Sequence, residues 1–248
     1  MCEGHFHVPG SGLSLVRWLT PCHCPVCGTP TEREGVCAYC DAALDAAQLS
    51  RTAFEAVPDR NVFSCRQIPA KLPCAAVFSY EYEAVRKFLF FLKQHPDSAA
   101  FRYAALRLAK VLHRFEGGGR TFYVHVPRSF AGKRTYGFDQ GALLARAAAD
   151  LTPDAVFVPC LARRRPAKPQ KELSAEERVR NQCGAFRMRM FYPLPAKEPE
   201  RIVIIDDVIT TGASALACAG VLRSRYPNAR LYGAFLAHTH SAPHSYHA

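Results

Sequence analysis

The sequence predicts an α/β protein: a mostly parallel sheet with flanking helices, preceded by a small cysteine-rich unit. Three observations lead to this prediction. From residue 74 onward, short apolar runs alternate with amphipathic stretches, as in strands joined by crossover helices. The run Ile202–Ile205 is apolar at every position, as in a central strand buried on both faces. Before residue 60, cysteines are frequent and long apolar periodicity is missing.

The amino-terminal part carries two Cys-x-x-Cys pairs, formed by Cys24 with Cys27 and by Cys37 with Cys40. Each pair can form a tight turn that aims two thiolates at one ion, and Gly28 follows the first pair where a left-handed residue is often needed. Two such knuckles give tetrahedral coordination of zinc, with no open position for chemistry, so the metal would be structural. The alternatives are four unrelated thiols or a redox pair.

Each later element has its own sequence signal. The helix predicted at 81–94 places Val85, Phe88, Leu89 and Leu92 on one face. The next helix, 98–115, stops at three consecutive glycines. The remaining predicted helices are 137–151 and 214–226, and the predicted strands are 74–80, 121–127, 155–162, 201–206 and 229–238.

Length and charge set limits on function. The 248 residues suffice for one large domain or a medium domain with a small appendage. The formal net charge of +11 suits a phosphate-rich ligand, whether nucleic acid or a polyphosphate sugar, and equally an ordinary soluble surface. No run approaches the roughly 20 apolar residues of a membrane span, and the amino terminus lacks the pattern of a secretion signal. We therefore expect a cytoplasmic protein with no membrane span.

Two neighbouring acids, Asp206 and Asp207, follow the central apolar run. Ligands of open α/β sheets bind beyond the carboxyl ends of the strands, and unpaired buried carboxylates are costly. Ribose hydroxyls, or magnesium held through water, would stabilise such a pair. The sequence therefore predicts a ligand site at this strand end.

The residues after the acids are typical of a phosphate cradle. Thr210, Thr211 and Ser214 offer hydroxyls, Gly212 allows close backbone approach, and the segment leads into a helix whose amino terminus attracts anions. The pattern of a Walker loop is absent. The alternative is an acidic strand end followed by a helix capped by threonine or serine.

The stretch VIIDDVITTGAS resembles the phosphoribosyl pyrophosphate (PRPP) motif of type I phosphoribosyltransferases. Three further stretches, LVRWLTPCHCPVCG, VPRSFAGKRTYGFDQGALLARAAADL and RRRPAKPQKELSAEERVRNQCGAF, occur in the order of the ComF family signatures. Together they resemble the ComF family, which is linked to DNA uptake and related to a gluconate-utilisation protein. The resemblance covers about residues 15–238.

The resemblance implies a fold and a domain division. We expect a zinc-ribbon-like domain with four cysteine ligands at 15–60, a linker at 61–73, a type I phosphoribosyltransferase-like domain at 74–240 and a disordered tail at 241–248.

The resemblance also implies a PRPP site with magnesium as cofactor. Asp206 and Asp207 would bind the ribose hydroxyls, and Thr210, Thr211, Gly212, Ala213 and Ser214 would bind the 5-phosphate. The pyrophosphate loop would use Arg128, Lys133 and Arg134. A mobile basic loop would contain Arg163, Arg165, Lys168, Gln170 and Lys171; a solvated basic loop is an equal reading of that run. Tyr136 stands where the family has arginine, so PRPP binding is a firmer expectation than its turnover.

Two functions follow as hypotheses. The first is pentosyl transfer from PRPP with release of pyrophosphate. The second is a non-catalytic accessory protein of DNA uptake, in which the zinc ribbon and basic surface bind single-stranded DNA or DNA-uptake proteins. The two can coexist in one chain.

Overall fold

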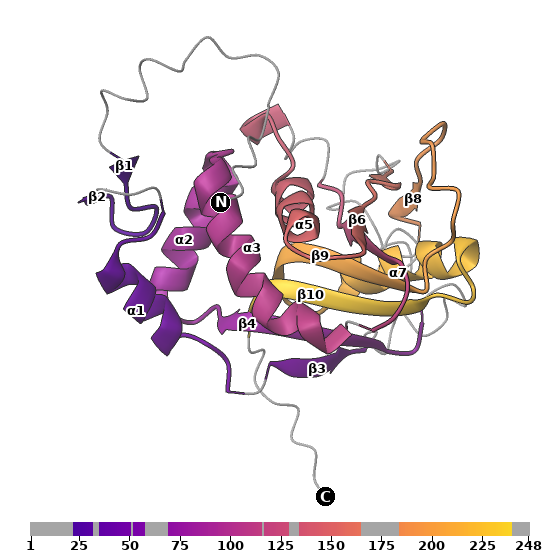
Figure 1. Ribbon diagram of the computed structural model, residues 1–248, viewed down its shortest axis with the longest axis horizontal. Coiled ribbons are helices and arrows are strands. Elements are labelled where there is room, and N and C mark those ends of the chain that lie inside the picture. Colours follow the sequence, from indigo (N-terminus) through magenta and orange to yellow (C-terminus); the bar gives the residue numbers. More distant parts are fainter. Residues whose placement is uncertain are drawn as a thin grey trace, which may run out of the picture.

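The computed structural model describes residues 22–31, 35–50, 52–57, 69–115, 117–128, 134–164 and 184–239 (Figure 1). Within these ranges, a six-stranded sheet forms the centre of the molecule, with strand order β3-β4-β10-β9-β5-β6. The strands are β3 (Ala53–Ala56), β4 (Leu72–Ser79), β5 (Thr121–His125), β6 (Ala155–Phe157), β9 (Arg201–Ile209) and β10 (Arg230–His238). All neighbours run parallel except β3, which is antiparallel to β4. The predicted mostly parallel α/β sheet is therefore confirmed.

Helices cover both faces of this sheet. The helices α2 (Glu83–Gln94), α3 (Ser98–Leu112) and α5 (Gln140–Asp150) pack on one face and share a core with Val77, Val203 and Ile205. A short 3₁₀ turn, His113–Phe115, follows α3. The helix α7 (Ala213–Arg225) packs on the other face, in a second core that contains Ile202 and Ile204. The alternating side chains of β9 thus enter two cores, which explains why the run is apolar at every position.

The chain leaves β5 and β9 in opposite directions across the sheet. From β5 it passes through α5 to β6, at the edge of the sheet. From β9 it passes through α7 to β10, on the other side. The adjacent carboxyl ends of β5 and β9 therefore form a topological switch point, where open α/β sheets bind their ligands.

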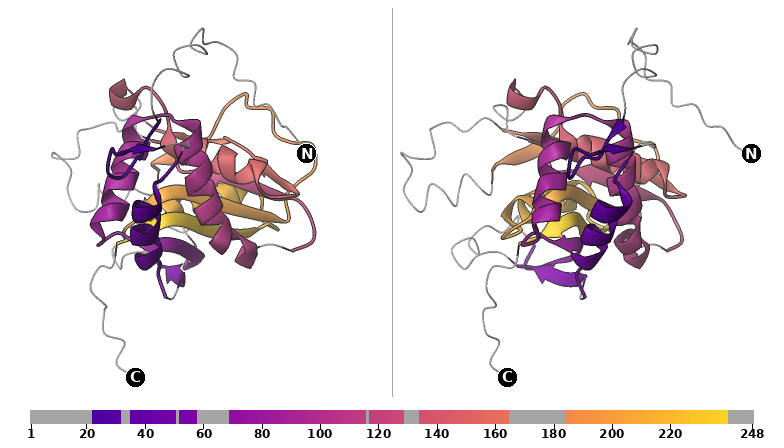
Figure 2. Two further views of the ribbon diagram at one scale, coloured as in Figure 1. Left: turned by 60° about the vertical axis from the view of Figure 1, so that its left-hand side comes forward. Right: turned by 90° about the vertical axis from the view of Figure 1, so that its left-hand side faces the viewer.

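The cysteine-rich unit consists of a hairpin and a helix that lie beside α2 (Figures 1 and 2). Its elements are β1 (Cys22–His23), β2 (Pro30–Thr31) and α1 (Ala38–Ala46). Leu44 of α1 is fully buried in the same core as α2 and α3. Arg107 of α3 forms ion pairs with Asp41 and with Asp45, the latter at 2.5 Å. The cysteine-rich unit therefore packs against the helices through buried side chains and ion pairs.

The boundaries expected for the amino-terminal part do not coincide with the strands of the main sheet. The strand β3 falls within the range 15–60, yet it pairs with β4 of the main sheet. The segment before it also runs along β4, since Leu49 N donates to Val77 O and Ala76 N donates to Thr52 O. Leu72 and Pro73, expected in the linker, belong to β4. The tail at 241–248 lies outside the described residues.

The single strand predicted at 155–162 is wrong. It is divided into β6 and β7 (Leu161–Arg163), and β7 pairs with β8 (Phe186–Met188) in a separate antiparallel ribbon. Pro159 lies between the two strands. Proline cannot donate to a strand ladder, so the chain leaves the main sheet there. Among the described residues, no helix has both the length and the apolar character needed to cross a membrane.

Candidate functional site

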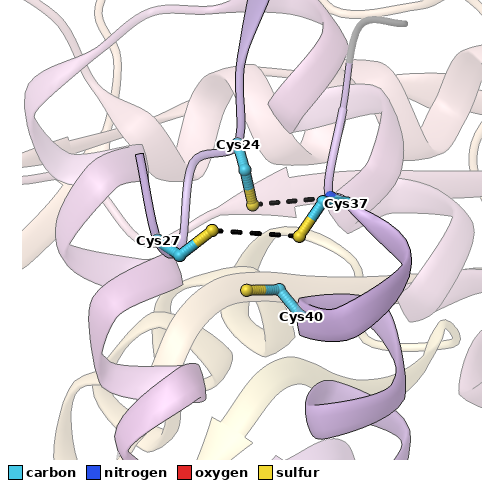
Figure 3. Close-up of side chains that lie close together, drawn as sticks. All are labelled: Cys24, Cys27, Cys37 and Cys40. Carbon is cyan, nitrogen blue, oxygen red and sulfur yellow. Dashed lines mark hydrogen bonds between the residues drawn. The ribbon is translucent and has the colours of Figure 1, made fainter. Parts of the chain in front are cut away.

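The four predicted cysteine ligands lie together (Figure 3). The Sγ atoms of Cys24, Cys27, Cys37 and Cys40 all fall within 4.8 Å of one another. Cys27 Sγ and Cys37 Sγ are 3.8 Å apart. A tetrahedral zinc ion with Zn–S bonds of about 2.3 Å separates its sulfur ligands by roughly 3.8 Å. The cluster can therefore hold a metal ion such as zinc.

The two cysteine pairs are presented by different local structures. Cys24 and Cys27 form the expected knuckle, in which Gly28 N donates to Cys24 O at 2.8 Å and Gly28 has a φ of +73°. Cys37 is instead the residue before α1, and Cys40 lies in its first turn. The second knuckle expected of a zinc ribbon is thus replaced by a helix amino terminus. Its positive dipole end favours thiolates.

The thiols differ in acidity. Hydrogen bonding with Thr29 lowers the pKa of Cys27 to about 6. Burial raises the pKa of Cys40, because a thiolate loses its hydration there. A cation at the centre would favour the thiolate form of all four residues. The arrangement supports binding of a metal more directly than it supports a redox pair.

The second candidate site lies at the switch point between β5 and β9. Asp206 and Asp207 were expected at the end of the strand, but they lie within β9, because pairing with β10 continues to Ile209. On the side of β5 the pairing stops at Ile205, opposite His125. The two acids therefore lie beyond the pairing with β5 but still within the pairing with β10.

Asp207 is buried and has two partners from other elements. Gln140 Nε2, at the start of α5, donates to Asp207 Oδ2 at 2.6 Å. Lys93 Nζ, near the end of α2, lies 3.3 Å from the same oxygen. Neither residue was identified from the sequence. Gln140 follows Asp139 in the stretch GFDQGALL and could have been identified as a candidate site residue. The sequence around Lys93 gives no indication that it contacts the site.

Asp206 is partly buried, and its carboxylate faces the start of α5. A Cβ added at Gly141 would stand 3.4 Å from Asp206 Oδ1, so the carboxylate lies against the first turn of the helix. Burial raises the pKa of Asp206 well above its usual value, and the negative charge of Asp207 raises it further. A bound cation or hydroxyl donors would oppose this shift and stabilise the charged form.

Further polar groups surround the acids. His125 Nε2 lies 3.6 Å from Asp139 Oδ2, and both residues lie close to Asp206. Arg128 N donates to Asp139 Oδ2 at 3.2 Å. His125 Nδ1, Arg128 Nη1 and Gln140 Oε1 are buried atoms without a hydrogen-bond partner in the described part of the chain. Buried polar atoms are normally satisfied, so these atoms leave capacity for a polar ligand.

The predicted phosphate cradle forms a tight turn into α7. Gly212 has a φ of +75° and is the residue before the helix, while Thr210 and Thr211 are exposed. Thr211 Oγ1 accepts a hydrogen bond from Ala213 N at 3.4 Å. Ser214 is exposed in the first turn of the helix. The first N–H groups of a helix have no intrahelical acceptor, so the turn offers donors to an anion.

The remaining predicted residues are only partly described. Arg128 lies in the segment that follows β5, with its guanidinium carbon 4.6 Å from the ring centroid of Tyr136. Arg134 is exposed in a short helical turn, and Arg163 is exposed at the end of β7. The other predicted residues lie outside the described ranges: Lys133, Arg165, Lys168, Gln170 and Lys171.

Comparison with known proteins does not identify a family, so the functional proposal depends on the residues of the site. No protein-family model matches the chain, and no curated protein matches it.

Proposed function

We propose that this chain binds PRPP, with magnesium, at the carboxyl edge between β5 and β9, as a phosphoribosyltransferase of type I. One observation carries the proposal. Two adjacent carboxylates stand at a topological switch point and are followed by a left-handed glycine and the amino terminus of α7. This combination offers acceptors for a diol and donors for a phosphate close together along the chain.

The proposal assigns a role to each group. Asp206 and Asp207 accept hydrogen bonds from the ribose 2′- and 3′-hydroxyls. Residues 210–214 bind the 5-phosphate through hydroxyls and backbone N–H groups. Arg128 contributes positive charge on the pyrophosphate side, and its unpartnered Nη1 supports that role. Magnesium, when bound with PRPP, would neutralise charge on the pyrophosphate.

The reaction would transfer the pentosyl group to a nitrogen nucleophile. The bond from C1 of the ribose to the pyrophosphate oxygen breaks, a C1–N bond forms, and pyrophosphate leaves with the electron pair. The protein would contribute positioning, fixed charges and exclusion of water. The nucleophile loses its proton to solvent or to a site carboxylate.

Calorimetry with the full chain tests this proposal. We expect magnesium-dependent PRPP binding by the natural sequence and no detectable binding by the double variant Asp206→Asn with Asp207→Asn. The control is Asp150→Asn, which changes an exposed acid at the end of α5 and leaves affinity unchanged. Undiminished PRPP binding by the double variant would refute the proposed site.

The cysteine cluster is proposed to hold one structural zinc ion. Metal analysis of the purified chain should give one zinc per molecule. Cys24→Ser or Cys40→Ser should lose it, because both sulfurs lie in the cluster. Cys22→Ser should keep it, since Cys22 precedes the cluster and is not part of it. Equal zinc content in all three variants would contradict this assignment.

A second function, binding of single-stranded DNA as expected from the link to DNA uptake, is favoured by the β7–β8 ribbon. Exposed arginines gather on and beside it: Arg163, Arg164, Arg187 and Arg189. Beyond β8, the side chain of Phe191 is 96% exposed. Basic groups bind the backbone and aromatic rings stack on bases.

Fluorescence anisotropy with a labelled thymidine oligonucleotide tests this second function. We expect Arg187→Ala and Phe191→Ala each to weaken binding about tenfold, since stacking on one base contributes about 1–3 kcal/mol. The double variant at Asp206 and Asp207 should bind the oligonucleotide normally. Binding that is insensitive to both ribbon substitutions would exclude this surface.

A further inference from the structure

A polar cavity of about 400 Å³ lies at the opposite edge of the sheet from the candidate PRPP site. It is lined by the amino-terminal ends of β9 and β10, by the 3₁₀ turn after α3 and by the glycines that follow that turn. Arg201, which lines it, precedes Asp206 by five residues on β9, which is roughly 17 Å at the rise of a strand. The cavity is therefore separate from the switch point.

Positive charge dominates the wall of this cavity. Among the described residues that line it, Arg114, Arg201 and Arg230 stand together with a single carboxylate, that of Glu200. Three guanidinium groups and one carboxylate give a formal charge of +2. The ion pairs between described residues all involve other groups, so none of these four groups has an ion-pair partner in the described part of the chain. Within the described part of the chain, the positive charge of the cavity therefore has no ion-pair partner.

Arg201 is the fixed member of this set, with only 6% of its surface exposed. Its Nη2 donates to Gly117 O at 2.5 Å and to Gly119 O at 2.8 Å, and its Nε donates to Thr121 Oγ1 at 3.2 Å. All these acceptors are neutral. Nη1 donates to none of the described residues, and a Cβ at Gly117 would stand 3.0 Å from it. Burying a guanidinium without an opposite charge is costly.

The backbone around the cavity is shaped for this arrangement. Gly119 has a φ of +91°, and a Cβ there would lie 1.9 Å from Glu200 Oε1. The positive φ favours glycine at this position, and the carboxylate of Glu200 lies against it. The rings of Phe115 and Tyr232, which also line the cavity, stack with centroids 4.6 Å apart. The walls are thus supported by packing, whereas the exposed side chains of Arg114 and Arg230 have room to close on a ligand.

We infer that this cavity is a second binding site, which takes a phosphate-bearing anion such as a phosphate monoester or an oligophosphate. Guanidinium groups bind phosphate oxygens in pairs of parallel hydrogen bonds, and a phosphate dianion matches the local charge of +2. The volume lies in the range of small-ligand sites, about 300–1,000 Å³.

The test uses inorganic pyrophosphate without magnesium and the full-length double variant Arg128→Ala with Arg134→Ala, so that the pyrophosphate contacts proposed at the switch point are impaired. Calorimetry should show one pyrophosphate bound per chain. Adding Arg230→Ala should weaken binding about tenfold, as expected for the loss of a charge-assisted hydrogen bond. Arg230→Lys should weaken it less, because the charge is kept and only the forked geometry is lost.

Arg102→Ala is the matched control, since Arg102 is an exposed arginine of α3 that does not line the cavity. It removes the same charge and should leave the affinity unchanged. Equal weakening by Arg102→Ala and Arg230→Ala would mean attraction by net charge and would overturn the inference. So would the absence of pyrophosphate binding to the double variant Arg128→Ala with Arg134→Ala. Neither outcome bears on magnesium-dependent PRPP binding by the natural sequence, which is measured separately.

Discussion

Lys93 Nζ lies 3.3 Å from Asp207 Oδ2 and joins the end of α2 to the carboxyl edge of β9. The side chain of Lys93 is 32% exposed and that of Asp207 is 11% exposed. This ion pair is thus shielded from water on one side. It neutralises one of two adjacent carboxylates and holds α2 beside the candidate site.

Replacing Lys93 by glutamine should destabilise the ligand-free protein. Asp207 would keep its hydrogen bond from Gln140 but lose a partly buried cation, so we expect the free energy of unfolding in urea to fall by about 1 kcal/mol. Lys87→Gln is the control on the same helix. Lys87 pairs with Glu83 at an exposed position, where such pairs contribute about 0.3–0.5 kcal/mol. Equal effects would show that the pair with Asp207 is no stronger than a surface pair.

The raised pKa of Asp206 predicts a stabilising substitution. The pKa of Asp206 is higher in the folded than in the unfolded state. The free energy of unfolding is therefore undiminished by Asp206 below about pH 3.9, and it falls as the pH rises through the folded pKa. Asp206→Asn removes this loss and can still accept the hydrogen bond from Asp207 N. We expect its free energy of unfolding at pH 7 to rise by about 1 kcal/mol or more.

Urea unfolding at pH 7 and near pH 4 tests this prediction. The advantage of Asp206→Asn should shrink toward pH 4, because the aspartate is then protonated in the folded state. A variant that is less stable than the natural sequence at pH 7 would show that Asp206 is charged and favourably bound. Asp150→Asn should show neither the gain nor its pH dependence, since Asp150 is exposed.

The docking of the cysteine-rich unit depends on Arg107. Its side chain is 10% exposed and pairs with two aspartates of α1, and Tyr103 donates to Asp41 at 2.5 Å. Arg107→Met should lower the free energy of unfolding by about 2 kcal/mol, below the 3–5 kcal/mol of a fully buried pair, because the aspartates are 41% and 50% exposed.

Limited proteolysis reports this docking directly. Arg107→Met should make α1 more susceptible to cleavage, whereas Lys110→Met should not. Lys110 is half exposed and lies 3.9 Å from Asp45, so its contribution is that of a surface pair. Unchanged protection of α1 in Arg107→Met would mean that apolar contacts such as those of Leu44 suffice for docking.

Gly212→Ala should disturb the turn into α7 for two separable reasons. A φ of +75° disfavours alanine by about 1 kcal/mol. In addition, the new Cβ would stand 2.8 Å from Ala56 Cβ on β3, and such overpacking costs about 1–3 kcal/mol.

Gly137→Ala separates the two contributions. Gly137 has the same φ of +75°, but no atom lies within 4 Å of the position that a Cβ would take there. Thermal unfolding should therefore show a loss of about 1 kcal/mol for Gly137→Ala and at least twice that for Gly212→Ala. Equal losses would mean that β3 gives way without cost. The Gly212 variant should also lose affinity for PRPP.

Sequence reasoning succeeded where the signal is local. The apolar run of β9 enters two cores, so burial on both faces is encoded residue by residue. The four cysteines were identified from spacing alone, because two residues between ligands suit both a knuckle and a helix turn. That ambiguity is also why the helical second pair was missed.

Long-range pairing was less accessible. The strand β3 has only four residues, and the segment between Ala56 and its partner Leu72 carries no hairpin-turn pattern that would indicate the pairing with β4. Lys93 meets Asp207 only because α2 packs over the sheet. The break at Pro159, in contrast, could have been predicted, because proline interrupts a strand wherever its N–H is required.

The contact between Ala56 and Gly212 has a consequence for evolution as well as for stability. The edge strand that supports the turn into α7 is an extension of the cysteine-bearing segment, which continues along β4 from Ala47. Deleting or exchanging the amino-terminal segment together with β3 would therefore leave β4 as an unpaired edge strand of the sheet. The inheritance of this segment together with the rest of the chain is imposed by the architecture.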